Sequence, residues 1–264
     1  VMVIDSAVIQ NNKANFIVEC GNPATRYSIK IDGVRYPIGF FSENKDIVVT
    51  GDINDNRNIT ASGSNAQQLI NEYNAENKKF NEKFSELLKK YRNAEQINDH
   101  DAMEKIENEY NQVEKNQNNY QTLFLTKNSN SFVAAYILYN NRYNYELNEI
   151  EDFVNNFNIN IENDYSKLLD EYIAILQRVD IGQPYLDFTQ ETPEGDMLSL
   201  SELVGKSKLL LIDFGASWCG LCRAENPNVV EVYNAYHEKG FDVLGVSLDM
   251  KKENWIKAIE DDGL

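Results

Sequence analysis

Two cysteines placed where an apolar strand runs into a helix constrain this chain more than any other feature. Residues 209–214 are apolar enough to read as a buried strand, and residues 223–239 read as a helix. Between them stands Cys219-Gly220-Leu221-Cys222, so the first sulfur falls at a helix N-terminus, where unpaired N–H groups and the helix dipole favour an anion. A thiolate is such an anion, and Cys222, one turn further on, can close a ring with it. The arrangement predicts thiol–disulfide exchange.

Length and charge bound the remaining possibilities. The 264 residues allow one to three domains, and a hydrophobic fraction of 42% can build their cores. The formal charge of −17, from 42 acidic and 25 basic residues, argues against nucleic acid or an anionic membrane surface as a partner. No apolar stretch approaches the ~18 residues of a membrane-spanning helix. The chain opens at Val1, which already reads as strand, and shows no signal peptide, so we expect a mature or trimmed chain.

Residues 1–65 predict a small antiparallel β domain. Short strand-like runs alternate with turn residues, and Asp32-Gly33 is a hairpin signal between residues 27–31 and 34–36. The expected strands cover residues 14–19, 26–31, 38–41 and 47–50.

Residues 66–179 predict a helical region. Apolar side chains at three- and four-residue spacing over 69–91 and again over 103–124 favour two antiparallel helices joined by a turn at 98–101. Further helices are expected over residues 132–140, 146–157 and 164–177.

Residues 180–264 predict an α/β domain. A hairpin is expected from strands at 185–189 and 196–200, followed by a short helix 202–204 with Ser201 as its N-cap. Strand 208–214, the helix that begins at the cysteines, strand 242–247 and helix 252–260 then follow. This β–α–β–α order predicts a parallel strand pair with a right-handed crossover.

Three further residues near the cysteines are candidates for the same chemistry. Asp213, at the end of the strand, is expected to be buried with a raised pKa, so that it accepts a thiol proton, although a strand-end carboxylate can also face water. Trp218 would shield the sulfur and offer a flat surface to a partner chain, unless it is ordinary packing. Glu225 lies one turn after Cys222 and could shuttle a proton, or be a solvated helix carboxylate.

Other uses of the cysteine pair fit the chain less well. A zinc site needs about four ligands, and the remaining chain offers only Cys20, His100 and His237, each isolated in sequence. Cys20 reads as a small buried hydrophobe. The pair could also be inert, but its place at a strand-to-helix junction and the small Gly220 argue against that. No metal or organic cofactor is required.

The segment 213–227, DFGASWCGLCRAENP, resembles the active-site strand and helix of thioredoxin-fold proteins, and residues 182–206 resemble their TlpA/ResA branch. The resemblance covers about residues 180–264. It implies that Cys219 is the attacking thiol, Cys222 the resolving thiol, Asp213 the buried acid and Glu225 the acid of the ResA-like branch. Residues 1–179 resemble, more loosely, the extension carried by envelope lipoproteins with such a domain.

The chain departs from that family at several positions. Leu221 stands where the family often has Pro, and Gly215 where it often has Trp. Residues between the cysteines adjust the redox potential, so Leu221 leaves the oxidising or reducing direction open. None of the 5 prolines follows the second strand, so the hairpin that carries a cis-proline in the family is missing. We therefore expect a truncated domain, from a longer protein or completed by another chain, with an exposed sheet edge.

The fold expected overall is an α+β extension followed by a truncated α/β thioredoxin-like domain. The resemblance implies a thiol–disulfide oxidoreductase of the bacterial envelope or periplasm, with Trp218, Gly220 and Leu221 facing the substrate. Its partners would be a membrane electron donor and proteins with disulfides or thiols, with apocytochromes among the candidates. The resemblance also allows a lipid anchor in a full-length precursor. The alternatives are a thiol-dependent peroxidase and a non-enzymatic envelope binding protein with a structural cysteine pair.

Overall fold

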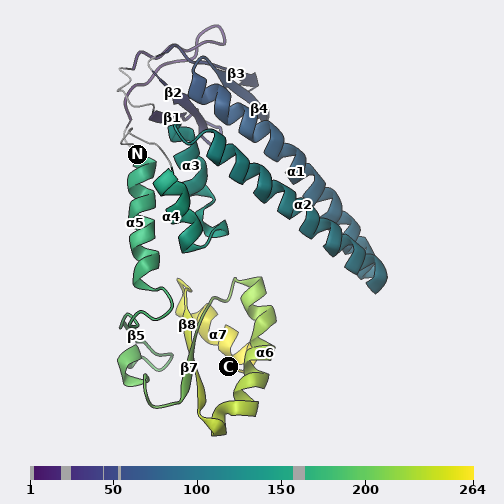
Figure 1. Cartoon of the computed structure of the whole chain (residues 1–264), viewed down its shortest axis with the longest axis vertical. Helices are drawn as coiled ribbons and strands as arrows, with labels where there is room; N and C mark the ends of the chain where they lie inside the picture. The colour runs from purple at the N-terminus through teal and green to yellow at the C-terminus, as the bar shows by residue number, and fades with distance from the viewer. Residues whose placement is uncertain (1–2, 19–24, 44, 53–54, 157–163) are drawn as a thin grey trace. The chain divides into compact units, whose positions relative to one another are not determined.

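The computed structural model describes residues 3–18, 25–43, 45–52, 55–156 and 164–264. The chain divides into two compact units, residues 1–180 and residues 181–264 (Figure 1). Both contain helices and strands, and the sheets of the amino-terminal unit are small and antiparallel. Within the described ranges, none of the helices combines the length and the apolar character needed to cross a lipid bilayer.

Two antiparallel hairpins open the amino-terminal unit. β1 (Thr25–Ile29) pairs with β2 (Ile38–Ser42), and β3 (Val48–Asp52) pairs with β4 (Asp55–Ser62). The strands predicted from residues 26, 38 and 47 onward are confirmed, each within two residues of its expected start.

The turn predicted at Asp32-Gly33 is confirmed, but the strand after it begins later than expected. Gly33 takes a left-handed φ of 82°, and the Val34 N–H donates to the Ile31 carbonyl at 3.1 Å. Residues 34–36 are not strand. Pro37 has no N–H to donate to a ladder, and pairing starts only after it.

The strand predicted over residues 14–19 is wrong for the part that the structure describes, residues 14–18. Their apolar character suits a strand, but within the described chain no neighbouring strand pairs with them, and the Ile17 side chain is almost fully exposed. Val1, Glu19 and Cys20, about which the sequence made predictions, lie outside the described residues.

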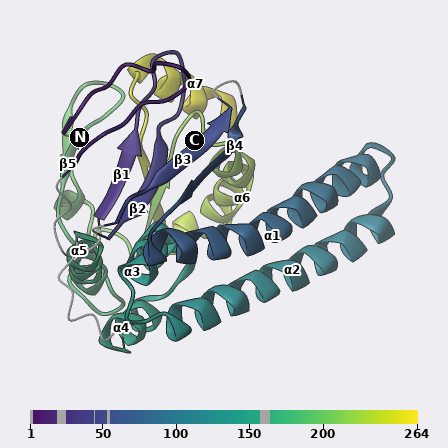
Figure 2. The ribbon, with the colours of Figure 1, turned by 90° about the horizontal axis from the view of Figure 1, so that it is seen from above.

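The predicted helical arm is confirmed. α1 (Asn65–Gln96) and α2 (His100–Lys127) lie side by side along most of their length (Figure 2). The side chains of Ser64 and Asp99 cap their N-termini by accepting backbone N–H groups of the first turn. Between the helices, the ring centroids of Phe84 and Tyr110 lie 4.7 Å apart, and both residues belong to the predicted apolar faces.

The helices α3 (Phe132–Asn140), α4 (Leu147–Asn156) and α5 (Asp164–Arg178) complete the amino-terminal unit, with a short turn η1 (Arg142–Asn144) after α3. All three helices were predicted. The α3 helix is apolar on every side and is buried, as an all-round hydrophobic helix must be.

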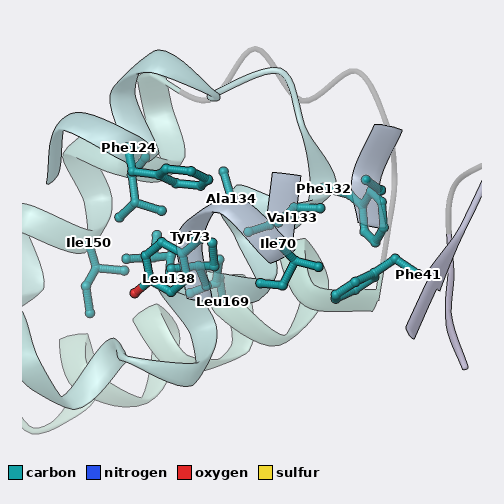
Figure 3. Close-up of a cluster of buried hydrophobic side chains, with 14 residues drawn as sticks. Phe41, Ile70, Tyr73, Phe124, Phe132, Val133, Ala134, Leu138, Ile150 and Leu169 are labelled. Carbon is teal, nitrogen blue, oxygen red and sulfur yellow. The ribbon is translucent and has the colours of Figure 1, made fainter. Parts of the chain in front are cut away.

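One hydrophobic core joins β2 to the helices of this unit (Figure 3). Phe41 of β2 packs edge-on against Phe132 of α3, with ring centroids 5.2 Å apart. The core takes side chains from β2 and from all five helices, including Phe41, Ile70, Tyr73, Phe124, Phe132, Val133, Leu138, Ile150 and Leu169.

The carboxy-terminal unit begins with the predicted hairpin, formed by β5 (Thr189–Glu191) and β6 (Met197–Ser199). Residues 185–188, predicted as part of the first strand, are not strand. This segment instead forms a hydrogen bond with the chain after β6: Asp187 Oδ1 accepts the Ser201 N–H at 2.9 Å.

The helical turn after this hairpin has a different cap from the predicted one. It is η2 (Leu200–Glu202), and Ser199, not Ser201, forms a reciprocal capping box with Glu202. The strand β6 ends at Ser199 in an extended conformation, which is the conformation that an N-cap residue needs.

The second half of this unit is the predicted β–α–β–α segment, and it carries the cysteine pair. It consists of β7 (Leu209–Gly215), α6 (Gly220–Tyr236), β8 (Phe241–Ser247) and α7 (Lys252–Asp262), with a short turn η3 (His237–Lys239) before β8. The strands β7 and β8 are parallel and in register from end to end. Their carboxyl ends therefore meet at the edge where α6 begins.

Candidate active site

Cys219 is the N-cap residue of α6, and Cys222 lies in the first turn of the same helix. The Cys222 N–H donates to the Cys219 sulfur at 3.2 Å. The two residues are joined by a disulfide, with their Cα atoms 5.3 Å apart. A sulfur in this position has the helix dipole and a backbone donor directed at it, and both stabilise a thiolate once the disulfide is reduced.

The surface beside the cysteines is open. Trp218 is 70% exposed and Leu221 is 87% exposed. Gly220 is exposed, and a Cβ added to it would meet no atom within 4 Å. These three residues, predicted to face a substrate, thus lie at the surface next to Cys219.

Asp213 lies on β7 opposite Gly245 of β8, six positions before Cys219. The expectation of a buried acid is only partly met, because the residue is half-buried. Its side chain makes no hydrogen bond or ion pair within the described part of the chain.

Glu225 occupies an exposed position on α6, one turn beyond Cys222. Its Oε2 accepts a hydrogen bond from the Asn228 side chain at 3.0 Å. The carboxylate is therefore solvated and has a neighbour further along the helix.

A carboxylate that the sequence analysis did not single out holds the turn in front of Cys219. Asp249, just after β8, accepts the Ser217 N–H at 2.8 Å and the Ser217 hydroxyl at 2.6 Å. These two hydrogen bonds, with the Ser247 hydroxyl and the charge of Arg223 adding to them, lower the pKa of Asp249. The carboxylate is therefore ionised at neutral pH.

A second group of charged residues fastens the first turn of α6 to the end of α7. The Arg223 guanidinium donates to both carboxylate oxygens of Asp262, and its Nη2 lies 3.7 Å from Asp261 Oδ2. Asn226 adds a hydrogen bond to Asp262 Oδ2 at 2.6 Å. The hydrogen bonds from Arg223 and Asn226 lower the pKa of Asp262, and the same ion pair raises the pKa of Arg223.

The sequence carried a signal for Asp249 that was not used. In a parallel strand pair the residues that follow each strand meet at one edge. Ser217 follows β7 by two positions and Asp249 follows β8 by two, so their meeting could be expected from the predicted order of elements. The pairing of Arg223 with Asp262 has no comparable signal, because it depends on how α7 packs against α6.

Metal-ligating residues form no cluster in the described part of the chain. Within those residues, no group of three or more His, Cys, Asp and Glu side chains lies close enough to hold a metal ion.

Comparison with known proteins shows what the carboxy-terminal unit is similar to. Residues 181–264 match the model of the AhpC/TSA family. Proteins similar to this segment include thiol–disulfide oxidoreductases named ResA, which confirms the resemblance read from the residues around Cys219.

Among these relatives, the thiol-disulfide oxidoreductase ResA of Oceanobacillus iheyensis is 37% identical over 76 residues, which are 28% of this chain and 38% of that protein. ResA of Bacillus cereus is 29% identical over 92 residues, 34% of this chain and 52% of that protein. The chain thus spans between about a third and a half of the length of these curated relatives.

Among solved structures, the thioredoxin domain of a thiol-disulfide oxidoreductase from Bacteroides vulgatus is 39% identical to this chain. The alignment covers 31% of this chain and 57% of that one, with a TM-score of 0.29.

Proposed function

We propose that this protein is a thiol–disulfide oxidoreductase that acts on protein disulfides through Cys219 and Cys222. One observation carries the proposal: Cys219 is the N-cap of α6, where its sulfur accepts the Cys222 N–H at 3.2 Å. This is the microenvironment that makes a cysteine thiolate available near neutral pH. The homology of residues 181–264 to thiol–disulfide oxidoreductases supports it.

In the reductive direction, the Cys219 thiolate attacks one sulfur of a substrate disulfide. A mixed disulfide forms, and the other substrate sulfur leaves as a thiolate and takes up a proton. Cys222 then loses its proton, attacks the Cys219 sulfur and releases the second substrate thiolate. Two electrons pass to the substrate, and the pair ends in the disulfide that the structure contains.

The proton of Cys222 needs an acceptor in the second step. We propose Asp213 for this role, through a water molecule, because a half-buried carboxylate on β7, six positions before Cys219, suits a general base. Glu225 is the second candidate, and its exposure argues for a smaller contribution. We propose that Trp218, Gly220 and Leu221 form the surface on which the substrate chain rests.

Reduction of insulin disulfides by the whole chain, with dithiothreitol as the electron source, tests the activity. We expect turnover by the native chain and none above background by the Cys219→Ser variant. A Cys222→Ser variant should instead accumulate a mixed disulfide with the substrate, because the resolving thiol is missing. A native chain no faster than Cys219→Ser would contradict the proposal.

The same variants separate the alternatives. A thiol peroxidase would consume hydrogen peroxide through Cys219 faster than it reduces insulin. Ala216 stands where the reactive cysteine of such enzymes usually has Thr or Ser three positions before it. A binding protein with a structural cysteine pair would keep its cellular role in the Cys219→Ser variant.

We propose the bacterial cell envelope or periplasm as the compartment, on the resemblance to the TlpA/ResA branch. That resemblance also supports a membrane thiol–disulfide donor that returns two electrons and two protons to the pair, a lipid anchor on a precursor, and apocytochromes in cytochrome c biogenesis as clients. Cell fractionation with an antibody against the native chain tests the compartment.

For the architecture, we propose a small antiparallel β domain over residues 1–65, a helical region over 66–179 and a thioredoxin-like domain over 180–264. The order of the elements supports this division, because β1 to β4 come first, α1 to α5 follow, and strands and helices are mixed only from β5 onward. Separate expression of residues 180–264 and a measurement of its thermal unfolding test the last boundary.

A further inference from the structure

The turn that delivers Cys219 to α6 is short and closed. It runs from Ala216 to Cys219, and the Cys219 N–H donates to the Ala216 carbonyl at 3.0 Å. Both polar groups of the Ser217 backbone have side-chain partners. Asp249 accepts its N–H at 2.8 Å, and Arg223 Nη1 donates to its carbonyl at 3.4 Å.

Asp249 is itself held in place by the end of β8. Its Oδ2 accepts the Ser247 hydroxyl at 2.9 Å, and its N–H donates to the same hydroxyl oxygen at 3.1 Å. Ser247 pairs with Gly215 at the last position of the β7–β8 ladder, and the Leu248 N–H donates to the Gly215 carbonyl at 2.9 Å. The carboxylate is thus attached to the sheet at the point where the turn leaves it.

The two bonds from Ser217 to Asp249 are charge-assisted, since the acceptor is an ionised carboxylate. Bonds of this kind are shorter and about twice as strong as neutral ones. The distances of 2.8 Å and 2.6 Å fit that class.

We propose that Asp249 is a positioning residue for Cys219: by fixing Ser217 against the end of β8, it holds the cysteine at the N-cap of α6. The inference rests on the function proposed above and deepens it. The hydrogen bonds of Asp249 go to Ser217 and Ser247 and not to the cysteines, so it acts through the turn.

The position of Cys219 at the N-cap determines how readily its thiol ionises. Cys219 benefits from the helix dipole and from the Cys222 N–H only while it remains the N-cap. Without the two bonds to Ser217 the turn has more conformations, and the sulfur spends part of its time away from these donors. The reduced thiol then titrates closer to the ordinary cysteine value of about 8.5.

The test uses the reduced whole chain and measures alkylation of Cys219 by iodoacetamide against pH, with the adduct located by peptide mass spectrometry. We expect the Asp249→Ala variant to raise the apparent pKa of Cys219. For each unit by which this pKa rises, the fraction of Cys219 that is thiolate at pH 6 falls tenfold. The nucleophilicity of the thiolate grows about threefold, so the rate of alkylation falls about threefold. Equilibration with glutathione should show a smaller fraction of the pair reduced than in the native chain.

Two further variants show how Asp249 acts. Asp249→Asn keeps an acceptor for the Ser217 N–H and loses the charge, so it should stay closer to the native chain than Asp249→Ala. Asp196→Ala, at an exposed aspartate in the β5–β6 turn, is the matched control and should leave the alkylation profile unchanged.

Each result of these measurements supports or contradicts the proposed role of Asp249. If Asp249→Ala alkylates like the native chain, or if Asp249→Asn shifts the profile as far as Asp249→Ala, positioning through the turn is wrong. Should Asp249→Ala not fold, Ser217→Ala removes only the hydroxyl bond and must give a smaller shift in the same direction. A native chain whose Cys219 is no more reactive than free cysteine contradicts the proposed function itself, whereas an active native chain with unchanged variants contradicts only the role of Asp249.

Discussion

Arg223 and Asp262 join the first turn of α6 to the last turn of α7. The guanidinium donates through Nε and Nη2 to the two oxygens of one carboxylate, and the Nη2 bond to Oδ1 is 2.6 Å long. This fork matches the planar geometry of both groups and fixes their relative orientation. The helix that carries the cysteines is therefore held at its beginning by the helix that follows β8.

The first prediction concerns this ion pair. Arg223→Ala should lower the midpoint of thermal unfolding of the carboxy-terminal unit, because it leaves the half-buried Asp262 without its main partner. Arg223→Lys should restore only part of the loss, since an ammonium group cannot form the fork. The control is Lys257→Ala, which removes an exposed pair with Asp261 on α7 and should have almost no effect. Equal effects of Arg223→Ala and Lys257→Ala would contradict this interpretation.

The second prediction concerns pH. The pKa values of Asp249 and Asp262 lie below their ordinary value of 3.8 in the folded protein, because both carboxylates accept hydrogen bonds. The unfolded chain therefore binds protons first, and the stabilisation is complete above about pH 4 and is lost as the pH falls through the lowered pKa values. Unfolding followed between pH 7 and pH 2 should show this loss. The double variant Asp249→Asn and Asp262→Asn should show a smaller dependence on pH, and an unchanged dependence would exclude these two groups as its source.

The third prediction separates the two candidate proton acceptors. Asp213→Asn should slow resolution of the mixed disulfide by about a hundredfold, the lower end of what a general base contributes. Glu225→Gln should slow it much less, because Glu225 is exposed and accepts a hydrogen bond from Asn228. Stopped-flow measurement of the decay of a preformed mixed disulfide gives both rates. A larger effect of Glu225→Gln would reverse the two roles.

The fourth prediction concerns the core of the amino-terminal unit. Leu138 of α3 is 0% exposed and packs in the centre of that core. Leu138→Ala should lower the free energy of unfolding of this unit by about 2–5 kcal/mol. Leu123→Ala, at a 70% exposed position of α2, should change it by less than about 0.5 kcal/mol. Urea unfolding followed by circular dichroism gives both values, and similar losses in the two variants would show that α3 is not at the centre of the core.

The elements that local chemistry determines could be predicted from the sequence. The helix that Cys219 caps was expected from the apolar strand before it, and the arm formed by α1 and α2 from the spacing of its apolar residues. The false strand at residues 14–18 shows the limit, because a strand exists only if another strand pairs with it.

Side-chain partners that lie far apart in sequence were harder to foresee. The half-burial of Asp213 depends on what covers β7, and the fork between Arg223 and Asp262 depends on the packing of two helices. Only the meeting of Ser217 with Asp249 follows from the order of the strands.

The reactivity of one sulfur tests the proposed function most directly. The rate of alkylation of Cys219 in the reduced native chain should follow an apparent pKa clearly below the ordinary cysteine value of about 8.5, and mild oxidation should regenerate the disulfide with Cys222. A Cys219 that titrates like cysteine in an unstructured peptide and forms no disulfide on oxidation would contradict it.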